Sequence, residues 1–365
     1  MVFYFPVILG VVRRVNVMHM ADALISPAVG GMMWATTAGV AAHAAKKLQK
    51  DLDDSKVPLM GVLGAFVFAA QMVNFAIPGT GSSGHLGGGL LLAILLGPHA
   101  AFLTMSSILT IQALFFADGG LLALGANIFN LGFFPCYIAY PFIYKKIVGA
   151  NPGKGRHVAG AMAAAVIGLQ LGAFAVVLET VFSGISALPF ASFVLLMQPI
   201  HLAIGLVEGL ITTAVILFIA KERPEILQKA VRVQPLSNVS LKPLLIAILA
   251  AAVVTGGILS WFASADPDGL EWSILKATGQ EELAAPQGTI HSVLAEWQQK
   301  IAVFPDYNVK EAGNVSDSAK VESSWPAVDR GTSLAGVAGS VLTLLLAALF
   351  GKGLQLAAGR RKQEC

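Results

Sequence analysis

The chain has 365 residues, of which 56% are apolar and only 12% carry a charge, whereas about 25% of the residues in an ordinary soluble domain are charged. Its mean hydropathy of +0.73 and its net charge of only +3 exclude a soluble globular domain and a basic nucleic-acid-binding protein. The composition therefore predicts an all-α polytopic membrane protein that lies in a lipid bilayer and has no nucleic-acid partner.

Nine apolar segments are candidates to cross the membrane, because a crossing helix needs about 20 apolar residues. We expect seven of them in a first unit and two in a C-terminal unit. The short segment 86–97 is followed at once by Gly97-Pro98-His99. It is either a crossing of minimal length or a helix packed inside the bundle. The segments are 26–45, 58–77, 86–97, 99–117, 121–144, 158–182, 193–220, 244–264 and 334–351.

Basic residues predict the orientation, because Lys and Arg concentrate in short cytoplasmic loops. If the nine segments alternate, 17 of the 24 basic residues fall on one side. The loop 265–333 contains 11 acidic and five basic residues, so we place it outside, together with the stretch 79–89, and the C-terminus inside. The 17 basic residues are Lys46, Lys47, Lys50, Lys56, Lys145, Lys146, Lys154, Arg156, Lys221, Arg223, Lys229, Arg232, Lys242, Lys352, Arg360, Arg361 and Lys362.

The first 17 residues do not fit this topology. They form a short apolar run followed by Arg13 and Arg14, which is the reverse of the charge order of a signal peptide. Either this is a short extension that is cleaved or tolerated, or the functional chain starts at Met18. We favour a start at Met18.

A start at Met18 would create a metal chelate. The Met18 amine, the His19 amide nitrogen and the His19 imidazole Nδ1 would close a five-membered and a six-membered ring around an ion. Three nitrogens in one plane suit Ni(II) or Cu(II) and, less strictly, Co(II). The alternative is that His19 is a polar residue near the membrane interface.

A fourth nitrogen can come from His85, which lies in the glycine-rich stretch 79–89. Glycines let one backbone approach another closely, so this loop can fold over the residues that follow Met18. The alternative is that these glycines only allow close packing of helices.

Several polar residues interrupt the apolar segments, where ionisable groups are costly and indicate an ion pathway or hydrogen bonds between helices. His201 and Glu208 are seven residues apart, so they share a helix face and can pair. No phosphate-binding loop or hydrolase motif is present, so the sequence predicts no catalytic activity. The polar residues are Gln71, Asn74, Gln112, Asp118, Asn127, Asn130, Glu179, His201 and Glu208.

Several motifs together resemble the substrate-specific component of nickel and cobalt energy-coupling-factor transporters, the NikM/CbiM family. The resemblance spans Met18 to about Lys221. Downstream, Pro267-Asp-Gly-Leu-Glu271 resembles the small NikN/CbiN-type partner, here fused to the C-terminal side. The first set of motifs is Met18-His19-x-x-Asp22, Gln71-Met-Val-Asn-Phe75, Gly81-Ser-Ser-Gly-His-Leu86, Ile111-Gln-Ala-Leu-Phe-Phe-Ala-Asp-Gly-Gly120, Gly125-Ala-Asn127 and His201-Leu-Ala-Ile-Gly-Leu-Val-Glu-Gly-Leu-Ile-Thr212.

The resemblance implies a square-planar site at the extracellular end, made by the Met18 amine, the His19 amide and imidazole, and the His85 imidazole. It implies Ni(II) or Co(II) as the transported substrate, no organic cofactor, and a bacterial or archaeal cytoplasmic membrane. It also implies that separate ATPase subunits and a transmembrane coupling subunit supply the energy. Residues that we expect along the pathway or around the ligands are Asp22, Asn74, Gln112, Asp118, Asn127, His201 and Glu208.

We therefore expect four parts: an N-terminal extension 1–17, a metal-capture domain 18–221, a cytoplasmic linker 222–242, and a two-helix unit 243–365 that contains the outer loop 265–333. This loop is either a solvated connector or a partner of the capture domain. The alternative function is a stand-alone secondary transporter or channel in which Glu179 and Glu208 carry protons. The ligands do not distinguish nickel from cobalt.

Overall fold

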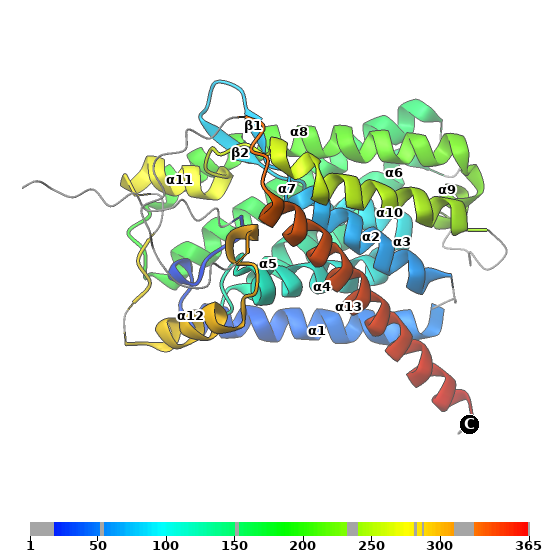
Figure 1. Cartoon of the computed structure of the whole chain (residues 1–365), viewed down its shortest axis with the longest axis horizontal. Helices are drawn as coiled ribbons and strands as arrows, with labels where there is room; N and C mark the ends of the chain where they lie inside the picture. Colours follow the sequence, from blue (N-terminus) through cyan, green and yellow to red (C-terminus); the bar gives the residue numbers. More distant parts are fainter. Residues whose placement is uncertain are drawn as a thin grey trace, which may run out of the picture.

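The computed structural model describes residues 18–51, 55–149, 153–231, 240–280, 283–286, 288–309 and 325–363, so the expected extension 1–17 lies outside the described residues. Most of the described chain is helical, and the long helices run along the longest axis of the molecule as a bundle (Figure 1). The prediction of an all-α membrane protein is confirmed.

The first unit contains the helices and the one hairpin that surround the candidate site. Its elements are η1 (Asp22–Leu24), α1 (Pro27–Asp51), α2 (Lys56–Gln71), β1 (Phe75–Ile77), β2 (Ser82–Gly84), α3 (Gly89–Leu96), α4 (Pro98–Phe116), α5 (Leu124–Ile128), η2 (Phe129–Tyr144), α6 (Lys145–Val148), α7 (Lys154–Ser183), α8 (Phe190–Glu222) and α9 (Pro224–Val231).

The C-terminal unit has two long helices with shorter elements between them. These are α10 (Lys242–Gly257), η3 (Leu259–Phe262), α11 (Gly269–Thr278), α12 (Ile290–Ile301), η4 (Pro305–Tyr307) and α13 (Arg330–Gln363). The loop 265–333 is therefore partly helical.

Each of the nine expected segments falls on a helix. Among the described residues, four helices are long and apolar enough to cross a membrane, namely α4, α7, α8 and α13, and two shorter apolar helices are α2 and α10. Helix α3 has eight residues, all buried, and at 1.5 Å per residue it spans only about 12 Å. It is too short to cross about 30 Å of hydrocarbon, so the expectation of a helix packed inside the bundle holds.

The expected end of the segment 58–77 is wrong. The segment 58–77 does not continue as a helix to its end, because α2 stops at Gln71 and β1 pairs antiparallel with β2. The turn between these strands contains Gly79 and Gly81, both with positive φ, a backbone conformation that favours glycine. The apolar residues at the end of this segment therefore belong to the hairpin that leads into the His85 loop.

The C-terminal helices pack directly on the first unit. A Cβ placed at Gly339 of α13 would lie 2.0 Å from the Phe68 ring of α2, and a Cβ at Gly336 would lie 2.2 Å from the carbonyl oxygen of Gly256 in α10. Small residues allow such close approach of membrane helices. The two units therefore share one packed interior.

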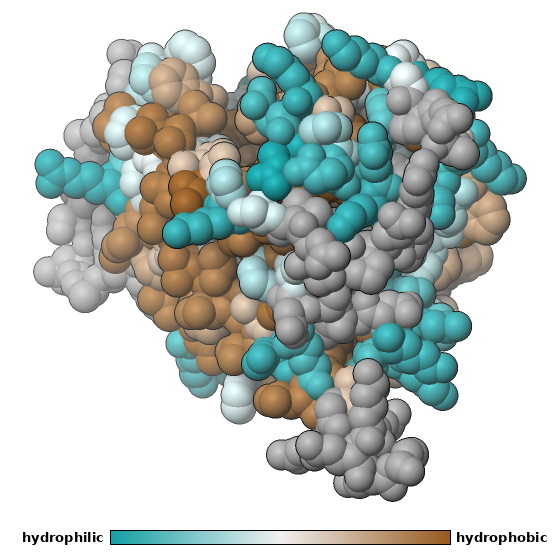
Figure 2. Space-filling view, turned by 90° about the vertical axis from the view of Figure 1, so that its right-hand side faces the viewer, coloured by the Kyte–Doolittle hydropathy of each residue, from teal (hydrophilic) through white to brown (hydrophobic). Residues whose placement is uncertain are grey.

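The basic residues at the end of α1, at the start of α2 and in α9 lie together at one end of the bundle (Figure 1). Figure 2 looks at this end and shows many hydrophilic side chains beside apolar surface. The hairpin, α11 and α12 lie at the opposite end (Figure 1). The candidate site is at that opposite end.

Candidate metal centre

Hydrogen bonds to α5 and to the residues before it hold the segment that follows Met18 in place. Asn127 of α5 accepts a hydrogen bond from the Met20 N–H at 3.1 Å and donates one to the Met20 carbonyl oxygen at 3.1 Å. Gly120 donates to the same oxygen at 3.0 Å. The carboxylate of Asp22 accepts from the Ala123 N–H at 2.9 Å. Asp22 and Asn127 are therefore placed to position His19.

Two glycines make this close approach possible. A Cβ at Gly119 would lie 2.9 Å from the Cβ of His19, and a Cβ at Gly120 would lie 1.8 Å from Oδ1 of Asp22. Gly119 also has a φ of +77°. Any larger residue at these positions would displace the segment that carries His19.

The glycine-rich loop brings His85 to His19. Their ring centroids are 5.3 Å apart. In His85, Nδ1 lies 3.2 Å from the Leu86 carbonyl oxygen and Nε2 lies 3.2 Å from the Met18 carbonyl oxygen. Because a neutral imidazole has one N–H, only one of these contacts is a hydrogen bond, and the other nitrogen keeps a lone pair for a metal ion.

Both oxygens of Glu208 hold this loop. They accept hydrogen bonds from the N–H groups of Gly87 at 3.0 Å and Gly88 at 3.2 Å. His201 donates instead to the Met197 carbonyl oxygen at 2.8 Å. The expected pairing of His201 with Glu208 is wrong, because Nδ1 of His201 and both oxygens of Glu208 bond to backbone groups instead.

One carboxylate, that of Asp118, contacts two donor atoms of the expected chelate. It accepts a hydrogen bond from the Met18 nitrogen at 2.9 Å, and its other oxygen lies 3.0 Å from Nδ1 of His19. Tyr307, in the C-terminal unit, donates to the same carboxylate. Neither ring nitrogen of His19 makes a hydrogen bond of good geometry among the described residues. The side chain of His19 is 3% exposed, and its imidazole is available as a ligand.

The surroundings of His19 and His85 shift the pKa values of the two imidazoles in opposite directions. Burial lowers the pKa of His19, but the negative charge and the contact of Asp118, with the charge of Asp268, outweigh it and leave this pKa raised. Burial and the neighbouring His19 lower the pKa of His85. Burial raises the pKa of Asp268 to about 7, although the backbone N–H of Glu271 and the charge of His19 oppose this effect.

The outer loop contacts the site directly, so the alternative of a solvated connector is wrong. The Ser83 N–H donates to the Pro267 carbonyl oxygen at 2.8 Å, and the Trp272 indole donates to the Thr80 carbonyl oxygen at 3.0 Å. Gln298 donates to the Gly119 carbonyl oxygen at 2.7 Å. The loop therefore covers both polypeptide segments that carry the histidines.

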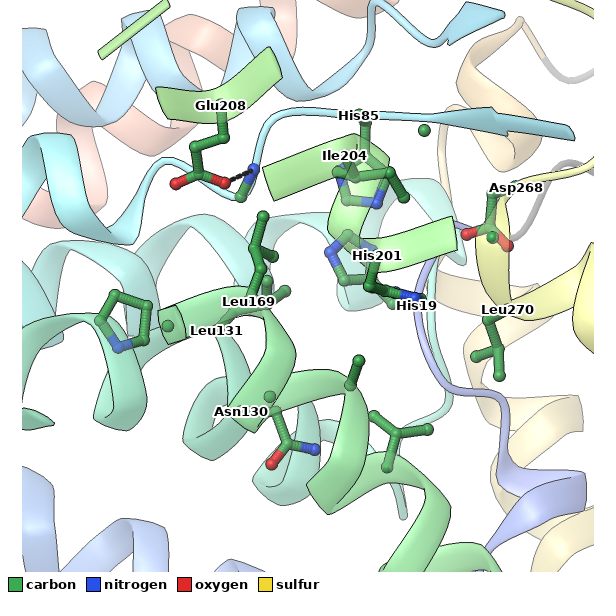
Figure 3. A pocket seen from close by; sticks show the side chains of 18 of the residues that line it. His19, His85, Asn130, Leu131, Leu169, His201, Ile204, Glu208, Asp268 and Leu270 are labelled. Carbon is green, nitrogen blue, oxygen red and sulfur yellow. Dashed lines mark hydrogen bonds between the residues drawn. The ribbon is translucent and has the colours of Figure 1, made fainter. Parts of the chain in front are cut away.

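A cavity of about 90 Å³ lies beside the two histidines, between α7, α8 and η2. Figure 3 shows His19, His85 and His201 in one part of this cavity, with Asp268 at its edge and Glu208 farther along α8. Its lining also includes Asn130 and small residues of α7, among them Gly168 and Gly172.

Two expected residues lie away from the histidines. The Gln112 side chain donates a hydrogen bond to the Gln71 side chain at 3.0 Å, and Gln71 donates to the Gly87 carbonyl oxygen at 3.0 Å. These two residues therefore stabilise the backbone of the loop that carries His85. The backbone carbonyl oxygen of Asn74 accepts a hydrogen bond from the Ser264 N–H at 2.7 Å. None of these three side chains lines the cavity.

No sequence motif marked Tyr307 and Gln298, which lie in the outer loop far from the histidines in sequence. Asp268 belonged to a noted motif but had no assigned role. No group of three or more His, Cys, Asp or Glu side chains in the described part of the chain is arranged to hold a metal ion. A site built on His19 and His85 therefore depends on backbone nitrogens.

The family model described as the cobalt uptake substrate-specific transmembrane region matches residues 19–226, more than half of the chain. This chain belongs to the CbiM family. The PDGLE domain model matches residues 242–356, the part that contains α10, α11 and α13.

Relatives of this CbiM-family chain include a protein named as a fusion and a protein named as CbiM alone. A protein of Archaeoglobus fulgidus, provisionally named a fused nickel transport protein NikMN, is 30% identical over 331 residues, which cover 90% of this chain and 96% of the relative. The cobalt transport protein CbiM of Sorangium cellulosum is 30% identical over 60% of this chain and 99% of its own length.

A crystal structure of a truncated transition-metal transporter is also similar. It is 32% identical in sequence, with a TM-score of 0.50 over 56% of this chain and 99% of that chain. The protein is therefore a multi-pass membrane component for cobalt or nickel transport and belongs to a transport family, not a catalytic one.

Proposed function

We propose that this protein is the substrate-binding subunit of an ATP-driven importer of nickel or cobalt in a bacterial or archaeal cytoplasmic membrane. Separate ATPase subunits and a transmembrane coupling subunit supply the energy. The observation that carries the proposal is the approach of the His19 and His85 ring centroids to 5.3 Å beside the hairpin.

The ion is held by four nitrogens: the Met18 amine, the amide and Nδ1 of His19, and one imidazole nitrogen of His85. In the metal-free arrangement, Asp118 contacts two of these donor groups, the Met18 nitrogen and His19 Nδ1. Metal binding replaces protons at these atoms, and the carboxylate then lies close enough to offset the charge of the cation.

The proposed topology follows the positive-inside rule. The end with the hairpin, α11 and α12 faces outside, and the C-terminus is cytoplasmic. Residues 18–221 form the capture domain, 222–242 the linker and 243–365 the two-helix unit with its outer loop.

A free amine at Met18 is required by this site and tests it directly. Intact mass measurement and Edman sequencing of the purified, metal-loaded protein should give Met18 as the first residue. Metal-loaded protein that still carries Arg13 and Arg14 would rule out the amine as a ligand.

Uptake measurements separate the importer from a stand-alone secondary transporter. Cells that express the chain with the ATPase and coupling subunits should take up radioactive nickel or cobalt, and uptake should stop when the ATPase subunits are omitted. The proton-carrier alternative gains no support from the hydrogen bonds, because Glu208 accepts from two backbone N–H groups and Glu179 accepts from Asn130 at 2.8 Å. Uptake that persists without the ATPase subunits would favour that alternative.

A further inference from the structure

Four residues of α8 line the cavity at positions i, i+4, i+7 and i+11: Met197, His201, Ile204 and Glu208. Two of them have clear structural roles. Ile204 fills the space at Gly84, where a Cβ would lie 2.4 Å from its Cγ1, and Glu208 holds the backbone of the loop. The role of His201 is not explained by either contact.

The ring of His201 is oriented as a metal ligand would be. Its Nδ1 lies 2.8 Å from the Met197 carbonyl oxygen, and because a carbonyl only accepts, Nδ1 must carry the proton. The lone pair of the neutral ring is then on Nε2, for which the described residues provide no hydrogen-bond partner. Metal-binding histidines usually donate their other N–H in this way, which fixes the tautomer and the ring.

The edge of the cavity next to His201 supplies a carboxylate. Asp268 is 5% exposed and caps the N-terminus of α11, where one of its oxygens accepts a hydrogen bond from the Glu271 N–H at 2.8 Å. The next residue, Gly269, packs against α8 so closely that a Cβ there would lie 3.2 Å from Cε1 of His201. Figure 3 shows the Asp268 carboxylate near His19 and His201.

We propose that Nε2 of His201 and the carboxylate of Asp268 form a second, weaker site for a divalent transition-metal ion, beside the His19–His85 site on the side of α11. The ion passes to this site when it leaves the four nitrogens. The inference rests on the proposed function, since it assumes that the first site captures the ion.

The donor set explains why this site is weaker. Imidazole and carboxylate ligands both suit Ni(II), Co(II) and Zn(II), but two protein ligands leave the remaining positions to water, so the ion exchanges readily. One ligand comes from the capture domain and the other from the C-terminal unit. The complete second site therefore requires both parts of the fused chain.

Binding of Co(II) to the purified full chain in detergent tests the proposal. Equilibrium dialysis should show one tightly bound ion and a second, weaker one. His201→Gln and Asp268→Asn should each lower the affinity for the weaker ion at least tenfold and change the tight affinity less than threefold. The retained tight site shows that each variant is folded. His43→Gln and Glu296→Gln, which change exposed residues elsewhere, should leave both affinities unchanged.

The outcomes separate this inference from the proposed function. If His19→Ala leaves the tight ion bound, the capture site is wrong, while the loss of the weaker ion in the two other variants still supports the second site. The second site is overturned by a wild-type protein that binds one ion only, by weak binding that both variants retain, or by loss of both ions in both variants.

Discussion

At the residue scale, Asp118 contacts both His19 and the outer loop. It is 4% exposed and contacts Met18, His19 and Tyr307. A buried carboxylate with these partners stabilises positive charge at the position where a cation is proposed to bind. The site is therefore prepared electrostatically before a metal ion arrives.

The side-chain ligands are the first residues to test. His19→Ala and His85→Ala should each lower Ni(II) affinity at least 100-fold, which is about 2.7 kcal/mol, because either change leaves too few nitrogens to complete the plane. His43→Ala and His157→Ala should bind as wild type. Calorimetric titration gives the affinities, and near-wild-type binding by either of the first two variants would contradict the ligand assignment.

Metal affinity should rise with pH. The pKa of His19 is raised, so its ring keeps a proton to a higher pH than a free histidine, and the metal ion must displace that proton. The lowered pKa of His85 keeps its ring neutral. Affinity should therefore fall as the pH is lowered through the raised pKa of His19, by about tenfold per unit for each proton displaced. Titrations at several pH values measure the slope, and a flat profile would contradict proton displacement.

At the scale of elements, close backbone contacts hold the two histidine segments together. The segment after Met18 lies against Gly119 and Gly120, and the loop after β2 is fixed by Glu208 of α8. These contacts restrict the histidines without a cage of acidic side chains. A single added methyl group should therefore disturb the site.

Gly120→Ala tests this packing. Its Cβ would overlap with Asp22, so the segment must move and Ni(II) affinity should fall at least tenfold. Gly31→Ala in α1 is the matched control, because a Cβ there has no neighbour within 4 Å and alanine favours a helix by about 0.5–1 kcal/mol. Calorimetry and thermal unfolding of both variants would show whether affinity and stability separate. Unchanged affinity in Gly120→Ala would mean that the segment tolerates displacement.

At the scale of the whole molecule, the C-terminal unit is an integral part of the bundle. Helices α10 and α13 cover α2, and the outer loop reaches the hairpin and Asp118. We therefore expect the two units to associate even without a covalent link. The linker then mainly raises their effective concentration.

A divided chain tests this association. Residues 18–231 and 241–365, expressed as separate polypeptides, should copurify and bind Ni(II) with the affinity of the intact chain. Gly339→Leu should greatly reduce copurification, because its side chain would overlap with Phe68, whereas Gly353→Leu on the same helix has no neighbour within 4 Å and should not. Affinity purification through a tag on one piece gives the result. Pieces that fail to associate without any substitution would contradict a shared interior.

The sequence by itself determined the membrane class, the positions of the helices and the candidate ligands. Long apolar segments and clustered basic residues are local signals, because crossing hydrocarbon imposes length and composition on each segment separately. His19 and His85 were also recognisable, since adjacent nitrogens and glycine-rich loops leave a local pattern.

Only the tertiary structure decided what surrounds those ligands. Tyr307 lies 189 residues from Asp118 in sequence, yet donates a hydrogen bond to it, and no periodicity encodes a contact between such distant loops. The end of α2 was equally hidden, because the apolar residues 75–77 fit a helix until their pairing with 82–84 is known. The same holds for His201 and Glu208: their spacing fixed a shared helix face, but the backbone groups available to each side chain in the folded chain decided its partner.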